Sequence, residues 1–166
     1  KIVAYSLWGE DPKYTMGAIK NAMLVERLLP DWICRIYIGM SVPQTIIGQL
    51  EKRANVELVR MDEGGDWTGM FWRFISADSD DVVISRDTDS RITQREVDAI
   101  NEWLESDKDF HIMRDHPYHG IEILGGMWGS RNGILRGIPE WVNDYITGKE
   151  ANYWQIDQEF LRDVVY

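Results

Sequence analysis

Short apolar runs alternate with helix-patterned stretches along this chain, and the alternation restricts the folds that it can adopt. Runs rich in β-branched residues predict strands, and apolar residues three or four apart predict helices. The order strand, helix, strand, helix is typical of a mostly parallel sheet with helices on both faces. We therefore expect an α/β fold in which the 166 residues form one domain around one core.

The predicted elements follow in regular succession. Pro30 ends the first helix, and Thr93 with Glu96 three residues later forms a capping box at the start of another. The predicted strands cover residues 1–7, 33–38, 56–61, 81–85 and 110–113, with a glycine-rich extended segment at 121–129. The predicted helices cover residues 16–29, 43–53, 67–76, a stretch after Thr93, 138–146 and 153–165.

The composition excludes several classes of partner. A formal net charge of -10 argues against a nucleic-acid backbone or an anionic membrane surface as the main partner. The lone Cys34 allows no intramolecular disulfide and no cysteine zinc cluster. No apolar run approaches the length of a membrane span, and no secretory signal is present, so we expect a cytoplasmic protein. Because the chain begins at Lys1 rather than Met and ends in a helix-like pattern, we expect it to be part of a longer protein.

Two aspartates, spaced one residue apart, follow the apolar run at residues 82–84. In open α/β sheets, ligands bind at the carboxyl ends of the strands. Side chains at i and i+2 of an extended segment project to the same side, so Asp87 and Asp89 can approach one cation and the phosphates that it carries. The local alternative is a strand-ending turn with an N-cap for the next helix, since Asp and Ser favour both roles.

A phosphate group would have to be held without a glycine-rich loop. The chain lacks Gly-x-Gly-x-x-Gly after its first strand, which disfavours an ordinary dinucleotide fold. It also lacks a Gly-Lys-Ser phosphate loop. Side chains and a metal ion are the remaining means of holding phosphate.

Several stretches together resemble the GT-A fold glycosyltransferases, including compact members from bacteria and large algal viruses. The resemblance covers most of the chain and implies a GT-A (Rossmann-like) domain in the cytoplasm, of the host if the protein is viral. It also implies a divalent ion (Mn²⁺ or Mg²⁺), a nucleotide-sugar donor, most often a UDP-sugar, and an acceptor hydroxyl such as that of a glycan. The matching stretches are residues 72–74 (Trp-Arg-Phe), 85–91 (Ser-Arg-Asp-Thr-Asp-Ser-Arg), 110–117 (Phe-His-Ile-Met-Arg-Asp-His-Pro), 123–129 (Ile-Leu-Gly-Gly-Met-Trp-Gly) and 157–161 (Asp-Gln-Glu-Phe-Leu).

The resemblance assigns the diphosphate and its metal to acids and arginines. Asp89 would ligate the metal directly, and Asp87 would contact the ribose or a metal-bound water. The metal would neutralise the leaving diphosphate. Arg73 and Arg86 would donate to phosphate or hold the aspartates in place, and a structural ion pair is the alternative for each. For Arg91, a solvated position at the start of a helix is an equal alternative to a role in the site.

The resemblance assigns the binding of the donor's base, ribose and sugar to other residues. Tyr5, Trp8 and Asp62, at or just beyond strand ends, would hold the base and ribose, with core packing the alternative for Tyr5 and a capping turn for Asp62. The glycine-rich run would floor the sugar pocket, because glycines let backbone approach a ligand closely. The aromatic residue of this run, Trp128, could stack on a sugar or fill the core. That run comprises Gly125, Gly126, Met127 and Trp128.

The acid that starts the last stretch is the first candidate for the general base. An inverting transferase needs a base that deprotonates the acceptor hydroxyl. Asp157 is the first candidate and Asp115 the second, and Glu159 would face the acceptor or the transferred sugar. For Asp157 and Glu159, acids favoured by a helix dipole are the alternative.

The three histidines of the chain receive lesser roles. His116 or His119 could complete the metal shell or bind a phosphate, and His116 is grouped with the sugar and acceptor pocket. A surface loop histidine is the alternative for both. His111 lies within a predicted strand and is interpreted as structural.

We interpret the chain as a metal-dependent glycosyltransferase, with inversion by single displacement favoured and a retaining course left open. A nucleotidyltransferase would carry a basic glycine-rich loop after strand one, where this chain has the acidic Trp8-Gly9-Glu10-Asp11. A phosphatase would place its Asp-x-Asp near the first strand rather than the fourth. A non-catalytic sugar- or nucleotide-binding module stays open, because the chain is short for the class. The donor sugar, the acceptor and the oligomeric state are not specified by these patterns.

Overall fold

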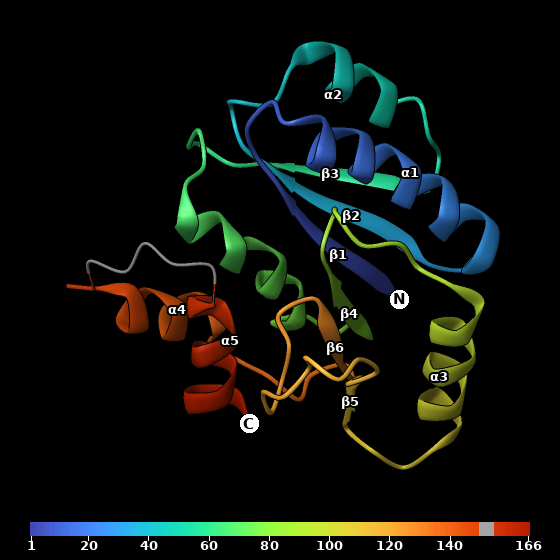
Figure 1. Ribbon diagram of the computed structural model, residues 1–166, viewed down its shortest axis with the longest axis vertical. Helices are drawn as coiled ribbons and strands as arrows, with labels where there is room; N and C mark the ends of the chain where they lie inside the picture. Colours follow the sequence, from blue (N-terminus) through green and yellow to red (C-terminus); the bar gives the residue numbers. More distant parts are fainter. Residues whose placement is uncertain (150–154) are drawn as a thin grey trace.

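A six-stranded sheet runs through the computed structural model, which describes residues 1–149 and 155–166 (Figure 1). The strand order is β3-β2-β1-β4-β6-β5. The first four strands pair in parallel, β6 pairs antiparallel with β4, and β5 pairs antiparallel with β6. The expected α/β fold with a mostly parallel sheet is confirmed. The strands are β1 (Ile2–Leu7), β2 (Ile33–Ile38), β3 (Val56–Arg60), β4 (Val83–Arg86), β5 (Phe110–Ile112) and β6 (Met127–Ser130).

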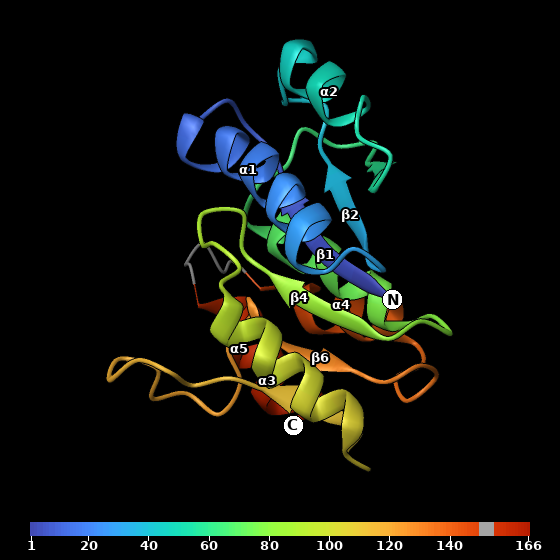
Figure 2. The same cartoon turned by 90° about the vertical axis from the view of Figure 1, so that its right-hand side faces the viewer.

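Helices cover both faces of this sheet, as the alternating pattern predicts. Helices α1, α2 and α3 pack on one face, and η1, α4 and α5 on the other (Figure 2). Among the described residues, no helix combines the length and apolar character needed to cross a membrane. The helices are α1 (Pro12–Leu28), α2 (Gln44–Leu50), the 3₁₀ helix η1 (Trp67–Ala77), α3 (Gln94–Glu105), α4 (Ile138–Ile146), α5 (Ile156–Phe160) and the π-helical η2 (Leu161–Val165).

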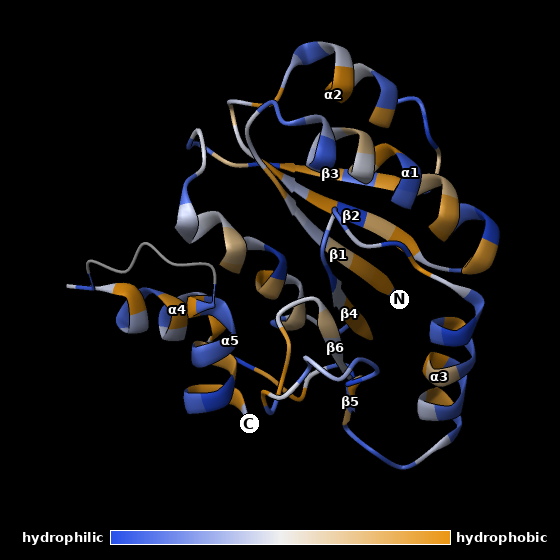
Figure 3. Cartoon of the chain, viewed as in Figure 1, coloured by the Kyte–Doolittle hydropathy of each residue, from blue (hydrophilic) through white to orange (hydrophobic). Residues whose placement is uncertain are grey.

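The core is divided between the two faces. Successive strand residues point to opposite sides of a sheet, so Val3, Tyr5 and Leu7 of β1 join the core beneath α1, α2 and α3. The intervening Ile2 and Ala4 pack with Val83. Figure 3 shows hydrophobic residues along the strands, and hydrophobic and hydrophilic residues alternating along the helices. The second core, on the η1 face, includes Phe71, Phe74, Trp128, Ile138 and Phe160.

Several predicted elements have other bounds in the structure; the first helix, for example, begins at Pro12 rather than at Met16. Two others differ in kind. The extended segment expected at residues 121–129 is a strand only from Met127, because the backbone at Gly125 and Gly126 packs against acidic side chains instead of a strand partner. The helix expected at 153–165 has two parts, α5 and η2, and residues 153 and 154 lie outside the described residues.

The strand order reverses between β1 and β4. The chain runs from β1 to β2 and β3 on one side, then returns to place β4 on the other side of β1. Arg86, the last residue of β4, is in register with Met127, the first of β6. The segments that follow β1 and β4 and the segment that precedes β6 therefore meet at one edge. A strand-order reversal at the carboxyl edge is where ligands bind in open α/β sheets.

Candidate active site

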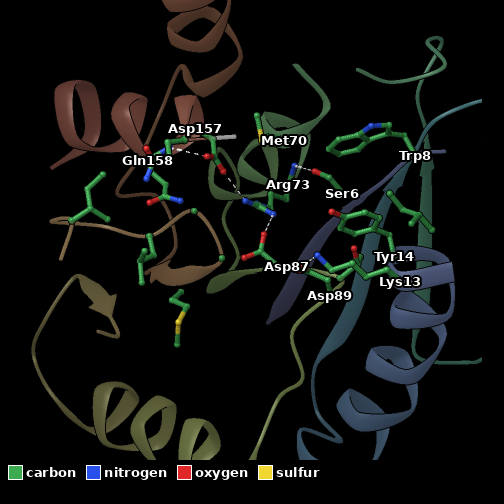
Figure 4. Close-up of a pocket in the computed structure, with 18 of the residues that line it drawn as sticks. Ser6, Trp8, Lys13, Tyr14, Met70, Arg73, Asp87, Asp89, Asp157 and Gln158 are labelled. Atoms are coloured by element: carbon green, nitrogen blue, oxygen red, sulfur yellow. Dashed lines mark hydrogen bonds and ion pairs between the residues drawn. The ribbon is translucent and has the colours of Figure 1, made fainter. Parts of the chain in front are cut away.

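A cavity of about 1180 Å³ opens at this edge of the sheet (Figure 4). Its wall comes from four regions that are distant in the sequence: the end of β1 with the start of α1, η1, the turn after β4, and the segments around β6 and α5. The side chains that matter for its chemistry are Trp8, Lys13, Tyr14, Arg73, Asp87, Asp89, Asp157 and Gln158.

A buried arginine joins two of the acids in this cavity. One amino group of Arg73 donates to Asp87 at 2.5 Å, and the other donates to Asp157 at 2.7 Å. The backbone N–H of Arg73 donates to the Ser6 hydroxyl at 3.0 Å, which ties η1 to β1. The side chains of Arg73 and Asp157 are 7% and 4% exposed, whereas that of Asp87 is 43% exposed. The network is therefore buried at one end and open to the cavity at the other.

Burial alters the acidity of this network. It raises the pKa of Asp157, and the nearby Asp87 adds to this rise, while Arg73 and the Gln158 N–H oppose it. For Arg73, burial acts to lower the pKa, but its two carboxylate partners outweigh that effect and raise it. Asp157 is thus a buried carboxyl group that binds a proton more readily than an exposed aspartate.

The turn that carries Asp87 and Asp89 is held from behind by α1. The side-chain amide of Asn21 donates to the carbonyls of Thr88 and Ser90 at 3.2 and 2.9 Å. Arg91 donates to the same two carbonyls. With its carbonyls bonded to α1 and Arg91, the turn presents both aspartates to the cavity. The segment is a turn, as the local alternative predicts, but the capping box of α3 is made by Thr93 rather than by these acids.

Asp89 also has a cationic partner. The ammonium of Lys13 contacts an Asp89 oxygen at 2.7 Å, and this contact raises the pKa of Lys13. In the part of the chain that the structure describes, no three His, Cys, Asp or Glu side chains form a metal-ligand cluster. The turn itself offers two carboxylates, those of Asp87 and Asp89, as oxygen donors. Two carboxylates are what a Mg²⁺ ion uses when substrate phosphates and water complete its shell, so the donor set fits a metal that arrives with a diphosphate.

Two glycines let the backbone approach the acids closely. A Cβ atom on Gly125 would lie 2.2 Å from an Asp157 oxygen, and one on Gly126 would lie 1.9 Å from an Asp87 oxygen. The Ser85 hydroxyl donates to the Gly125 carbonyl at 2.8 Å and fixes the segment against β4. The structure therefore places both glycines in the cavity wall, next to the aspartates.

Aromatic side chains form the wall at the end of β1. Trp8 lines the cavity, and its ring packs edge-on against Trp72 with centroids 5.9 Å apart. Tyr14 lies nearby on the first turns of α1. Aromatic rings of this kind can stack on another planar ring.

Three residues expected at the site lie elsewhere. Tyr5 is 1% exposed in the core beneath α1. Arg86 forms a buried ion pair with Glu96 of α3, and Trp128 packs against Phe74 with ring centroids 5.5 Å apart. None of the three lines the cavity. Their positions match the alternatives of core packing and a structural ion pair.

The remaining expected acids also lie outside the cavity lining. Asp62 is exposed in the loop after β3. Asp115 is paired with Arg95 and with His119, each at 3.2 Å. Glu159 acts electrostatically on residues of the α4 and η2 region rather than lining the cavity.

The histidines divide between the loop and the sheet. His116 is exposed, with its ring 5.1 Å from that of Tyr118, and does not line the cavity. His119 does line it. His111 stacks on Trp103 at 5.4 Å, and burial together with the charge of Arg86 lowers its pKa to about 4, which matches its structural interpretation.

Lys13, Tyr118 and Gln158 line the cavity but were not singled out from the sequence. For Lys13 a signal exists, since it lies six residues beyond the first strand, at the same sheet edge as Asp87 and Asp89. Tyr118 lies in a loop without a periodic pattern, so its position at the cavity could not be predicted from the sequence. Gln158 could have been inferred from its neighbour Asp157.

No family model and no curated protein matches the chain. Among solved structures, a crystal structure of S. aureus TarS 1-349 is similar, with a TM-score of 0.54 at 14% sequence identity. The match covers 96% of this chain and 53% of the other, so the chain spans about half the length of the solved TarS chain. TarS is a glycosyltransferase, and at this identity the likeness supports a glycosyltransferase-like fold.

Proposed function

We propose that the protein is a metal-dependent glycosyltransferase that transfers a sugar from a nucleotide-diphosphate donor, UDP-sugar first among them, to an acceptor hydroxyl such as that of a glycan. The observation that carries the proposal is the meeting of Asp87, Asp89, Arg73 and Asp157 in one cavity where the strand order reverses. We also propose that the protein is related to the compact bacterial and viral members of this class.

The charge of the cavity favours a metal-bound ligand. Among the described residues that line it, two side chains, Lys13 and Arg73, carry permanent positive charge, and Arg73 is already bound to two acids. A diphosphate entering alone would meet excess negative charge, so a divalent cation would have to accompany it. Asp89 and Asp87 would hold Mn²⁺ or Mg²⁺, which would neutralise the leaving diphosphate. The six carboxylates of the lining are Glu10, Asp11, Asp87, Asp89, Glu122 and Asp157.

Each remaining group has a role that its position supports. Trp8 would stack on the nucleobase, and the backbone at Gly125 and Gly126 would let the sugar approach the acids. Arg73 holds Asp87 and Asp157 in fixed positions. Asp157, whose raised pKa brings it closer to that of a useful base, would accept the proton of the acceptor hydroxyl, as inversion by single displacement requires.

Donor binding is tested by thermal unfolding with UDP, GDP, ADP and CDP, each with and without Mn²⁺. A ligand that binds only the folded state raises the melting temperature. We expect one nucleotide, UDP first, to raise it only with Mn²⁺. Asp89→Ala should abolish that shift and leave the fold intact, and Asp31→Ala, at an exposed acid far from the cavity, should keep it. No shift with any nucleotide would contradict the proposal.

A non-catalytic nucleotide- or sugar-binding module is the second candidate. It is favoured by the ion pairs that already engage Asp87 with Arg73 and Asp89 with Lys13. Release of UDP from UDP-sugars in the presence of glycan acceptors distinguishes the two functions. Binding without turnover, by a protein that contains all of the chain, would favour the module.

A further inference from the structure

We propose that Lys13 is a diphosphate-binding residue that Asp89 holds until the metal-bound donor arrives. The proposal rests on the proposed function and names a residue of the same cavity that no sequence pattern assigned. In the free protein the ammonium contacts an Asp89 oxygen at 2.7 Å. That carboxylate is also the first candidate for the metal, so Lys13 and a metal ion compete for the same oxygens.

The position of Lys13 beside Asp89 is set by backbone packing. Lys13, Gly17 and Asn21 are four residues apart and share one face of α1. A Cβ on Gly17 would lie 2.1 Å from the Thr88 carbonyl, so the helix touches the turn there. Asn21 bonds the turn one helical turn further along. The helix is thereby docked on the turn, and the lysine at its start is brought to Asp89 whether or not the ion pair forms.

Lys13 can change partner, whereas the other cavity cation cannot. Arg73 is 7% exposed and uses both amino groups on Asp87 and Asp157, so turning to a ligand would break a buried network. The Lys13 side chain is 58% exposed, and its ammonium has three donors on a flexible stem. Its next neighbour is the Tyr14 ring, 4.9 Å away, which leaves the ammonium free to turn into the cavity.

The two roles of Lys13 predict effects of opposite sign. When a metal ion binds to Asp89, the ammonium is displaced but stays within reach of a phosphate that the same ion holds. Removing the positive charge should therefore strengthen the binding of Mn²⁺ alone, because a competitor is lost. It should weaken the binding of a metal-bound diphosphate, because a charge-assisted hydrogen bond is lost. A lysine that serves only as a surface ion pair would not produce this reversal.

The test compares Lys13→Met with Lys13→Arg and with Lys20→Met, an exposed lysine on the same helix outside the cavity. Binding of Mn²⁺ alone is measured by the free-ion signal in electron paramagnetic resonance. Binding of UDP and of pyrophosphate is measured by calorimetry at saturating Mn²⁺, and pyrophosphate makes the result independent of the base. Circular dichroism and melting curves establish that each variant is folded.

For Lys13→Met we expect Mn²⁺ alone to bind about two- to fivefold more tightly. We expect UDP and pyrophosphate with Mn²⁺ to bind about tenfold more weakly. Lys13→Arg should keep most of the diphosphate affinity, and Lys20→Met should match the unaltered protein. If either affinity is unchanged in folded Lys13→Met, the role of Lys13 is overturned while the proposed function stands. If the unaltered protein binds neither UDP nor pyrophosphate with Mn²⁺, the proposed function fails and the role of Lys13 fails with it.

Discussion

Arg73 and Arg86 are both buried and both paired with carboxylates, yet they lie on opposite faces of the sheet. Arg86 of β4 pairs with Glu96 of α3, and each of these side chains is 8% exposed. Arg73 of η1 is as buried, but its partner Asp87 is 43% exposed and lines the cavity. One ion pair is closed to solvent, whereas the other continues to a surface that a ligand can reach.

This difference arises from the alternation of side chains at the end of β4. Arg86 and Asp87 are consecutive, so they point to opposite faces, toward α3 and toward η1. A closed pair serves the fold, since losing one partner leaves an uncompensated buried charge. A pair that opens on a cavity can serve chemistry, since a ligand can compete for its exposed partner. Variants of the Arg86 pair should therefore lose stability, whereas variants of the Arg73 network should lose ligand binding or turnover.

The largest expected effect is on turnover, from Asp157→Asn. The amide keeps the shape of the side chain and still accepts from Arg73, but it cannot take a proton. We expect turnover of the sugar donor to fall by about 10²–10⁴-fold, the usual contribution of a general base. The free energy of unfolding should not fall, because the neutral amide replaces a carboxylate whose charge is disfavoured by burial. Asp163→Asn, at an exposed acid of η2, is the matched control, and full turnover by Asp157→Asn would mean that another group is the base.

The next effect is on stability, from Arg86→Met. This change leaves Glu96 buried without its partner, and we expect the free energy of unfolding in urea to fall by about 3–5 kcal/mol. The folded fraction should bind UDP with Mn²⁺ as the unaltered protein does. Arg86→Met combined with Glu96→Gln should recover part of the loss, because the charge is gone and the amide can still cap Thr93. Weaker binding by folded Arg86→Met would place Arg86 in the site and remove the contrast with Arg73.

The same contrast shows what the sequence could predict. Alternating apolar runs predicted the sheet, its covered faces and the edge at which Asp87 and Asp89 would lie, because each follows from periodicity. The same alternation also points Arg86 away from Asp87, but the resemblance assigned Arg86 to phosphate or to holding the aspartates in place, with a structural ion pair as the alternative. What the pattern did not contain was which face of the sheet carries the cavity.

Other positions could not be inferred for specific physical reasons. Every residue of β1 is buried, so hydropathy did not show that Tyr5 faces the core while the chain end at Trp8 faces the cavity. The loop with His116 and His119 has no period, so nothing indicated that only the second lines the cavity. The pairing of Lys13 with Asp89 depends on how α1 docks on the turn, which is a tertiary contact.

A smaller effect is expected on binding, from Gly126→Ala. The added Cβ would lie 1.9 Å from an Asp87 oxygen, so Asp87 or the backbone must shift. Overpacking of this kind costs about 1–3 kcal/mol, and we expect UDP with Mn²⁺ to bind at least about fivefold more weakly by calorimetry. Gly48→Ala in α2, where a Cβ would meet open space, should bind normally. Equal affinities in the two variants would show that the glycine is not needed for the position of Asp87.

The smallest effect concerns the pH dependence of stability that Asp157 confers. Burial, with Asp87 adding to it, raises the pKa of Asp157 above 3.8, its ordinary value, so the folded protein binds this proton more readily than the unfolded chain. The stability gained from that proton is complete below pH 3.8 and is lost as pH rises through the folded-state pKa. Asp157→Asn should remove this loss, which urea unfolding of both proteins across the acidic range would show as curves that converge toward low pH. Parallel curves would contradict the raised pKa, and with it the physical basis for choosing Asp157 as the base.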